Sequence, residues 1–210
     1  MTILFDLDGT LIDSTEAILE SFEVALSAFG EVLPDEASIK AEIGHPLDIM
    51  FRTLGVSEEK VWEHVSVYKE HYQMVANTKT VLLPSAHEAI VLAKLHATLG
   101  IVTTKTAAYS KEMLEHMGIM QYFDLLIGRE DVTHPKPHPE PILKAISKLN
   151  ADKKRCWMIG DTSMDILAAE AAQIQSIAVT CGYVSYRELS QYTSNLSPNA
   201  LEAVKIIIVS

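Results

Sequence analysis

Two aspartates, Asp6 and Asp8, follow a short apolar run near the start of the chain and stand one residue apart before a Gly-Thr pair. Two carboxylates at the end of a buried strand are unfavourable, because nearby like charge and loss of water both raise carboxyl pKa values. A bound cation or a proton would offset that cost. The pair therefore suggests a functional site, whereas a solvated turn is the alternative for such a pair alone.

Further residues with chemical potential stand at other turns of the chain. Asp161 and Asp165 lie in the run Gly-Asp-Thr-Ser-Met-Asp after an apolar segment, where acids at a helix N-terminus are an alternative explanation. Thr103 closes another apolar run, and Lys136 lies in a loop rich in Pro and His, where a lysine is ordinarily solvated. The significance of each residue depends on whether the fold brings them together.

Five apolar runs predict buried parallel strands, with helical patterns between them. The runs cover residues 3–5, 99–102, 125–127, 156–159 and 176–179. Helical periodicity is clear at 111–116, ahead of Gly118, and at 140–149. This alternation predicts an α/β fold with a Rossmann-like doubly wound parallel sheet, in which ligands bind beyond the carboxyl ends of the strands.

The segment 14–80 shows repeated helix signals and no convincing strand. We expect its clearest helix to begin at an N-cap, Ser57. One face of that helix would carry Val61, Val65, Tyr68, Tyr72 and Val75. Because the segment is too long for an ordinary crossover, we expect an α/β core of residues 1–13 and 81–210 and an inserted all-helical cap at 14–80.

The order of these motifs resembles that of the haloacid dehalogenase (HAD) superfamily, and in particular its phosphoglycolate phosphatase-like members with a helical C1-type cap. The matching motifs are D-x-D-G-T from Asp6, a strand-end Thr103, the loop lysine Lys136, and G-D-x-x-x-D containing Asp161 and Asp165. They recur in order across nearly the whole chain. The resemblance implies a hydrolase with a HAD-like core.

The resemblance also implies a mechanism and a cofactor. Asp6 would attack phosphorus and form an aspartyl-phosphate, and Asp8 would serve as general acid and then general base. Mg²⁺ would be held by the Asp6 carboxylate, the Asp8 backbone carbonyl and Asp161, with Asp165 acting from a more distant position or through water.

Thr103 and Lys136 would contact the transferring phosphoryl group, since phosphoryl transfer relies on positioning and electrostatics. Thr104 and Lys105 are expected to contribute to substrate binding, although Lys105 fits a plain surface role equally well. His134 and His138 flank the motif lysine, and we interpret them as loop histidines rather than ligands.

The cap is expected to select the substrate. Gly44 and His45 lie where family members carry a specificity loop, with Arg52 just beyond it, and a helix–turn–helix corner is the alternative for this segment. Hexose-phosphate mutases of the superfamily carry a cap histidine and a cap arginine where this chain has Ile18 and Leu47. Those departures weigh against a mutase.

Magnesium-dependent hydrolysis of a small phosphomonoester is the favoured function, with phosphoglycolate as the leading substrate. The alternatives are an inorganic pyrophosphatase of the same family, a sugar-phosphate mutase, and a protein that binds without catalysis. Ser85 and Gln173 stand where relatives usually have glycine, which questions the backbone geometry at those two positions.

The composition limits the partners. A formal net charge of -11 and a pI near 5.1 disfavour nucleic acid and anionic membranes as partners. A small phosphorylated metabolite is the partner that the family resemblance implies. No signal-type segment or membrane-length apolar stretch is apparent. Cys156 and Cys181 have neither metal-ligand nor disulfide spacing, which favours a reducing, cytoplasmic location. A monomer and a homodimer both remain open.

Overall fold

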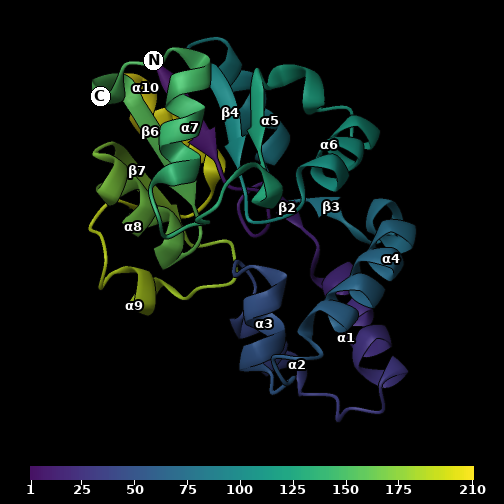
Figure 1. Ribbon diagram of the computed structural model, residues 1–210. Helices are drawn as coiled ribbons and strands as arrows, with labels where there is room; N and C mark the ends of the chain where they lie inside the picture. The colour runs from purple at the N-terminus through teal and green to yellow at the C-terminus, as the bar shows by residue number, and fades with distance from the viewer. The chain divides into compact units, whose positions relative to one another are not determined.

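The computed structural model describes residues 1–210 and contains a six-stranded parallel sheet (Figure 1). Its strand order is β5-β4-β1-β6-β7-β8, and every neighbouring pair is parallel. The strands are β1 (Thr2–Phe5), β4 (Thr98–Val102), β5 (Leu125–Ile127), β6 (Cys156–Gly160), β7 (Gln175–Val179) and β8 (Leu196–Ser197). The predicted α/β class is confirmed, with all five expected strands present and β8 as an additional short edge strand.

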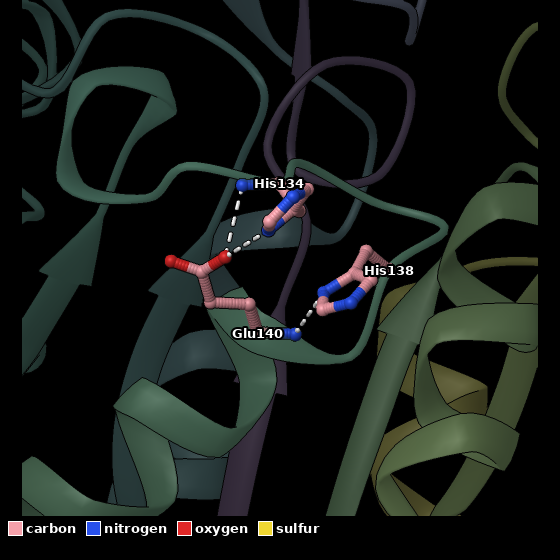
Figure 2. A group of neighbouring side chains, drawn as sticks. All are labelled: His134, His138 and Glu140. Atoms are coloured by element: carbon pink, nitrogen blue, oxygen red, sulfur yellow. Dashed lines mark hydrogen bonds and ion pairs between the residues drawn. The ribbon is translucent and has the colours of Figure 1, made fainter.

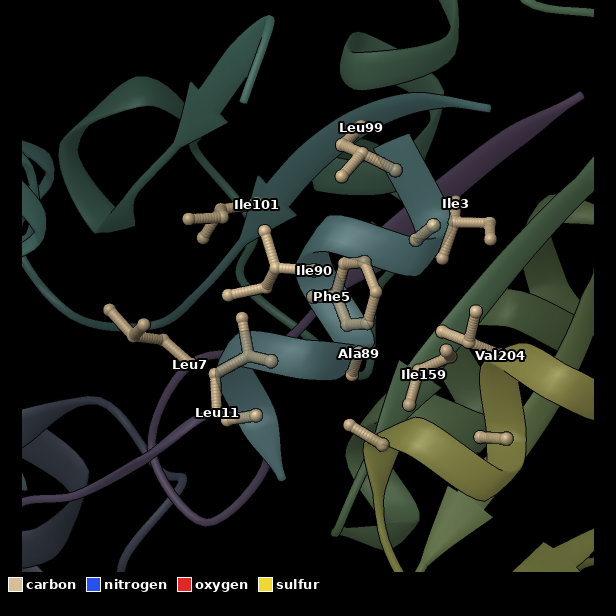
Figure 3. Close-up of a cluster of buried hydrophobic side chains, with 14 of the residues drawn as sticks. Ile3, Phe5, Leu7, Leu11, Ala89, Ile90, Leu99, Ile101, Ile159 and Val204 are labelled. Carbon is tan, nitrogen blue, oxygen red and sulfur yellow. The ribbon is translucent and has the colours of Figure 1, made fainter. Parts of the chain in front are cut away.

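Helices cover both faces of this sheet. The main ones are α5 (Ala86–Lys94), α6 (Ala107–His116), α7 (Glu140–Leu149), α8 (Ser163–Ala172) and α10 (Ala200–Val209), with a short α9 (Tyr186–Leu189). One face packs on α5, α6 and α10, and the other on α7 and α8. Figure 3 shows the first of these clusters, in which Phe5 and Ile101 of the sheet lie near Ile90 of α5. The side chains of β1 are therefore buried on both faces of the sheet, as expected for a parallel sheet that helices cover on both faces.

The central strand β1 fixes the position of Asp6, the residue that directly follows it. It pairs with β4 on one side and with β6 on the other, so Phe5 lies opposite both Ile101 and Ile159. The Asp6 N–H then donates to the Ile159 carbonyl at 2.8 Å and extends the pairing by one residue. From β1, the chain adds later strands outward in both directions, β4 and β5 on one side and β6, β7 and β8 on the other. In open α/β sheets, a binding crevice forms at such a switch point.

Contacts divide the chain into two units, one of Met1–Asp13 with Leu82–Ser210 and the other of Ser14–Val81. The second unit contains α1 (Thr15–Ala28), α2 (Glu36–Ala41), α3 (Leu47–Thr53) and α4 (Val61–Lys79). Its interior is aromatic, with the Phe22 ring 4.6 Å from that of Phe51 and 5.0 Å from that of Tyr68. Short strands β2 (Ile12–Asp13) and β3 (Val81–Leu82) form a separate two-stranded sheet.

The expected start of the long helix was wrong. α4 begins at Val61, and Ser57 is no N-cap; its carbonyl accepts from the Lys60 N–H at 2.9 Å in a turn ahead of the helix. Glu58, the residue after Ser57, lies outside the helix and pairs with Arg52. Val75 is only partly buried, whereas His64 is fully buried on the inner face of α4.

Both glycine departures noted in the sequence fall on left-handed backbone. Ser85 has φ 66° ahead of α5, and Gln173 has φ 60° at the end of α8. A side chain in this region meets the neighbouring carbonyl, at a cost of about 1–2 kcal/mol that glycine avoids. No helix of the structure combines the length and apolar character that crossing a membrane requires.

Gln173→Gly should therefore stabilise the protein. Relief of the left-handed strain outweighs the greater flexibility of glycine in the unfolded chain, leaving a net gain of about 0.5–1 kcal/mol. Urea unfolding of the variant beside wild type measures this difference. Glu170→Gly, in the body of the same helix, is the matched control and should destabilise by about 1 kcal/mol. Equal losses in both variants would contradict the strain argument.

Candidate active site

The polar residues singled out in the sequence gather beyond the carboxyl ends of β1, β4 and β6. Asp6 follows β1, Thr103 follows β4 and Asp161 follows β6, and each is at most 4% exposed. A parallel sheet aligns these strand ends on one edge, which explains how positions far apart in sequence meet. The site therefore depends on sheet order rather than on any single local motif.

Lys136 reaches this edge from the loop ahead of α7. Its Nζ lies 2.9 Å from Asp6 Oδ1 and 2.5 Å from Asp165 Oδ1, and the residue is only 3% exposed. Burial lowers the pKa of this lysine, but the charges of Asp165 and Asp6 outweigh that effect and raise it above its usual value. The predicted loop lysine is thus a buried, charged member of the cluster.

Asp161 is held between two backbone segments. Thr10 Oγ1 donates to its Oδ1 at 3.1 Å, and the Tyr183 N–H donates to its Oδ2 at 2.9 Å. The approach is so close that a Cβ at Gly9 would lie 2.2 Å from Asp161 Oδ2, and one at Gly182 would lie 2.1 Å from it. Only glycine leaves room for the carboxylate at both places.

Asp165 has two structural roles at once. Its Oδ2 accepts from the Thr162 N–H at 3.1 Å and from the Thr162 hydroxyl at 2.7 Å, completing a capping box at the start of α8. Its Oδ1 accepts from Lys136. The helix-terminus explanation considered for this acid is therefore correct, and the same side chain also belongs to the charged cluster.

Three buried carboxylates face a single buried cation. Burial, followed by the charge of Asp165, raises the pKa of Asp6 to about 7, with Lys136 acting in the opposite sense. Burial raises the pKa of Asp161 well above its usual range, and the charges of Asp6 and Asp165 act in the same direction. The arrangement lacks positive charge.

A divalent cation fits this site. Ligand oxygens of Asp6, Asp161 and Asp165 lie within 4.8 Å of one another. A donor set made only of oxygen suits Mg²⁺, a hard ion that binds through a few carboxylates and keeps several waters. The excess of buried carboxylate therefore gives this cluster the chemistry of a site that could hold a divalent cation.

Asp8 is less enclosed than Asp6 and pairs with a second lysine. Lys105 Nζ lies 3.2 Å from Asp8 Oδ2, and both side chains are about one-eighth exposed, at 12% and 13%. Thr103 Oγ1 accepts from the Lys105 N–H at 3.1 Å, while Thr104 between them is partly buried. The structure thus places Lys105 beside the expected general acid rather than on a plain surface.

The expected substrate residues Gly44, His45 and Arg52 belong to the helical unit. Gly44 has φ 110° in the turn between α2 and α3, where the His45 N–H donates to the Glu42 carbonyl at 3.0 Å. Arg52 is held by Asp48 at 2.6 Å and by Glu58. The segment from α2 to α3 is thus a helix–turn–helix corner, and acids of the same unit engage the Arg52 guanidinium.

Three residues of the cluster were not identified from the sequence as parts of the site. Thr10 ends the D-x-D-G-T motif, and Thr162 with Asp165 matches the Thr-x-x-Asp capping pattern, so both carried a local signal. Tyr183 contributes through its backbone N–H, which no side-chain pattern predicts.

Comparison with known proteins gives a consistent result. The family model for haloacid dehalogenase-like hydrolases matches residues 3–179. The chain is 38% identical to a Dickeya dadantii (strain 3937) protein named Probable phosphatase IndB, with 86% of this chain and 81% of that protein covered. It is 32% identical to a phosphoglycolate phosphatase from Colwellia psychrerythraea (90% and 88% covered) and 35% identical to pyrophosphatase PpaX from Oceanobacillus iheyensis (85% and 82% covered).

A solved structure shows the same architecture. A haloacid dehalogenase-like family hydrolase from Streptococcus pneumoniae superposes with a TM-score of 0.88 at 28% identity. The similarity covers 98% of this chain and 97% of that one. The similarity therefore includes residues of both the sheet-containing unit and the helical unit.

Asp161→Asn should stabilise the cation-free protein at alkaline pH. Because the pKa values of Asp6 and Asp161 are higher folded than unfolded, the folded state binds more protons, and stability falls as pH rises from about 4 through about 7. The amide removes one of the repelling charges, so its melting temperature at pH 8 with EDTA should exceed that of wild type by at least about 3 °C.

Thermal melts at pH 5 and pH 8, with EDTA or with Mg²⁺, test this expectation. The advantage of the variant should grow with pH in EDTA, and Mg²⁺ should stabilise wild type more than the variant. Glu112→Gln, at an exposed position on α6, is a control for loss of one negative charge. A variant less stable than wild type in EDTA at pH 8 would contradict the proposed charge imbalance.

Proposed function

Because this chain belongs to the haloacid dehalogenase-like hydrolase family and is a phosphatase of that family, we propose that it hydrolyses small phosphomonoesters through a phosphorylated Asp6, with Mg²⁺ as cofactor. The observation that carries the proposal is the contact between Asp6 Oδ1 and Lys136 Nζ at 2.9 Å, at the buried end of β1. It pairs a nucleophilic oxygen with the charge that a phosphoryl group requires.

In the first half-reaction, the Asp6 carboxylate attacks phosphorus in line with the leaving oxygen. One P–O bond forms to Asp6 as the bond to the alcohol breaks. Lys136, already charged beside the nucleophile, stabilises the negative charge of the equatorial phosphoryl oxygens, and the Thr103 hydroxyl adds a hydrogen bond. Asp165 keeps Lys136 in place through their 2.5 Å contact.

Proton transfer falls to Asp8. A protonated Asp8 would give its proton to the leaving alcohol oxygen and, as a carboxylate, would then take a proton from the water that hydrolyses the aspartyl-phosphate. Its partial exposure suits a group that must reach both substrate and water. Lys105, 3.2 Å away, orients the carboxylate between these steps.

Asp6, Asp161 and the backbone carbonyl of Asp8 are the proposed magnesium-binding groups. Bound Mg²⁺ would neutralise the repulsion between the carboxylates and polarise a phosphoryl oxygen. Thr10 and the Tyr183 N–H hold Asp161 in position for this purpose. Asp165, occupied by Lys136 and Thr162, acts as a positioning residue.

Phosphoglycolate is the proposed substrate, because similar proteins carry the name phosphoglycolate phosphatase. Pyrophosphate is the second candidate, supported by the similarity to pyrophosphatase PpaX. Thr104, Lys105, Gly44, His45 and Arg52 are our candidates for substrate selection. The thiols of Cys156 and Cys181 are both free, which agrees with the proposed cytoplasmic location.

Asp6→Asn should reduce the turnover rate at least about a thousandfold, because the amide is not a competent nucleophile. Phosphate release in Mg²⁺ measures this, and circular dichroism checks that the variant is folded. Asp35→Asn is the matched control; asparagine can still cap α2, so its activity should equal that of wild type. Undiminished turnover of the Asp6 variant would refute the covalent mechanism.

Wild-type protein should release phosphate fastest from phosphoglycolate in a panel that also contains pyrophosphate, sugar phosphates and nucleotides. EDTA should abolish this activity and Mg²⁺ should restore it, because the buried acids need a counter-charge. Comparison of kcat/KM values across the panel tests the substrate. A preference for pyrophosphate would replace the leading substrate, and conversion of a sugar phosphate into its isomer would indicate a mutase.

A further inference from the structure

A second group of potential ligands lies on the loop that carries Lys136. His134 and His138 stand on either side of that lysine, and Glu140 is the first residue of α7 (Figure 2). Their ligand atoms lie within 4.8 Å of one another, and the two imidazole centroids are 4.7 Å apart. Both histidines are exposed, whereas Lys136 between them is buried. The loop therefore turns its lysine inward and its imidazoles outward.

Glu140 is a fixed, charged ligand candidate. Its Oε1 accepts from the Thr133 N–H and its Oε2 from the His134 N–H, both at 2.9 Å. These two hydrogen bonds, with a smaller contribution from the His134 ring, lower its pKa to about 2. A carboxylate held in this way is negative at all ordinary pH values and is ordered before any ligand arrives.

Both imidazoles already contact Glu140, the His134 ring at its carboxylate and the His138 ring at its backbone N–H. His134 Nδ1 lies 3.0 Å from Glu140 Oε2, so a metal ion could take the place of the proton between them. His138 Nδ1 accepts a 3.2 Å hydrogen bond from the Glu140 N–H, a long contact that is easily given up. Figure 2 shows both rings and the carboxylate on one side of the loop.

The sequence favoured plain loop histidines, but the grouping of both rings with Glu140 changes that interpretation. We propose that His134, His138 and Glu140 form a binding site for a borderline transition-metal ion such as Zn²⁺, separate from the oxygen-only site at Asp6. Two imidazole nitrogens and one carboxylate oxygen are a zinc donor set that leaves a fourth position for water. Imidazole suits Zn²⁺, Ni²⁺ and Cu²⁺, whereas Mg²⁺ prefers oxygen ligands. The two sites of this protein would thus select different ions by donor type.

The structural change needed for such binding is small. Tetrahedral zinc with bonds of about 2.0–2.1 Å brings its ligand atoms to about 3.3 Å from one another. Both imidazoles are exposed, so their rings have room to rotate toward a carboxylate that two backbone hydrogen bonds hold in place. The acidic net charge of the chain, -11, also favours cation binding.

His138→Ala tests the site in the full-length protein. Zinc chloride is titrated against a chelating indicator, and the variant should bind zinc at least tenfold more weakly than wild type at one site per chain. His96→Ala, at an exposed histidine outside the cluster, should bind as wild type does. His134→Ala should repeat the loss seen for His138→Ala. Unchanged zinc affinity in both cluster variants would overturn the proposal.

The location of the ion is tested by anomalous diffraction from zinc-soaked crystals of wild type. We expect one peak bonded to both imidazoles and to the Glu140 carboxylate at about 2.0–2.1 Å. A peak confined to Asp6, Asp161 and Asp165 would overturn the proposal. Because titration and diffraction both read the metal directly, their outcome is independent of whether the protein hydrolyses phosphoglycolate.

Discussion

The structure depends on an imbalance of buried charge at the end of β1. Asp6, Asp161 and Asp165 are each at most 4% exposed, and Lys136 is the only buried lysine beside them. A fold does not keep three carboxylates out of water unless other groups compensate. Hydrogen bonds from Thr10, the Tyr183 backbone and Thr162 offset part of this cost. The remainder is the charge that the proposed magnesium ion would neutralise, so the proposal links the stability of the cation-free protein to its chemistry.

Compensation also explains why the surrounding backbone is so constrained. Gly9 and Gly182 leave the space that Asp161 occupies, and a Cβ at Gly160 would lie 2.2 Å from Asp165 Cγ. Lys136 reaches the site from a loop whose geometry is braced by Glu140 on its outer side. The same loop thus carries a buried lysine and two exposed histidines beside the Glu140 carboxylate.

Much of this arrangement could be predicted because its signals are local. Apolar runs marked the strands, and parallel strands align their carboxyl ends, so polar residues at those ends were expected together. The prediction of Ser57 as an N-cap was wrong because a local capping signal does not take account of contacts made elsewhere. Glu58 pairs with Arg52, and the helix starts at Val61. The strand β8 has two residues, too few to show a periodic pattern in the sequence. Tyr183 contacts Asp161 through its backbone N–H, a group that every non-proline residue possesses. These features depend on tertiary contacts, which sequence patterns alone do not encode.

The placement of β1 in the middle of the sheet has a consequence for synthesis of the protein. Its residues are synthesised before those of its two neighbours, which are β4, at Thr98–Val102, and β6, at Cys156–Gly160. A nascent chain that ends before β6 contains Asp6 and Lys136 without Asp161, and it leaves one edge of β1 open. Such edges are prone to aggregation during folding. The order of synthesis therefore delays protection of this edge, and assembly of the full set of buried carboxylates, until β6 and the Asp161 that follows it have emerged.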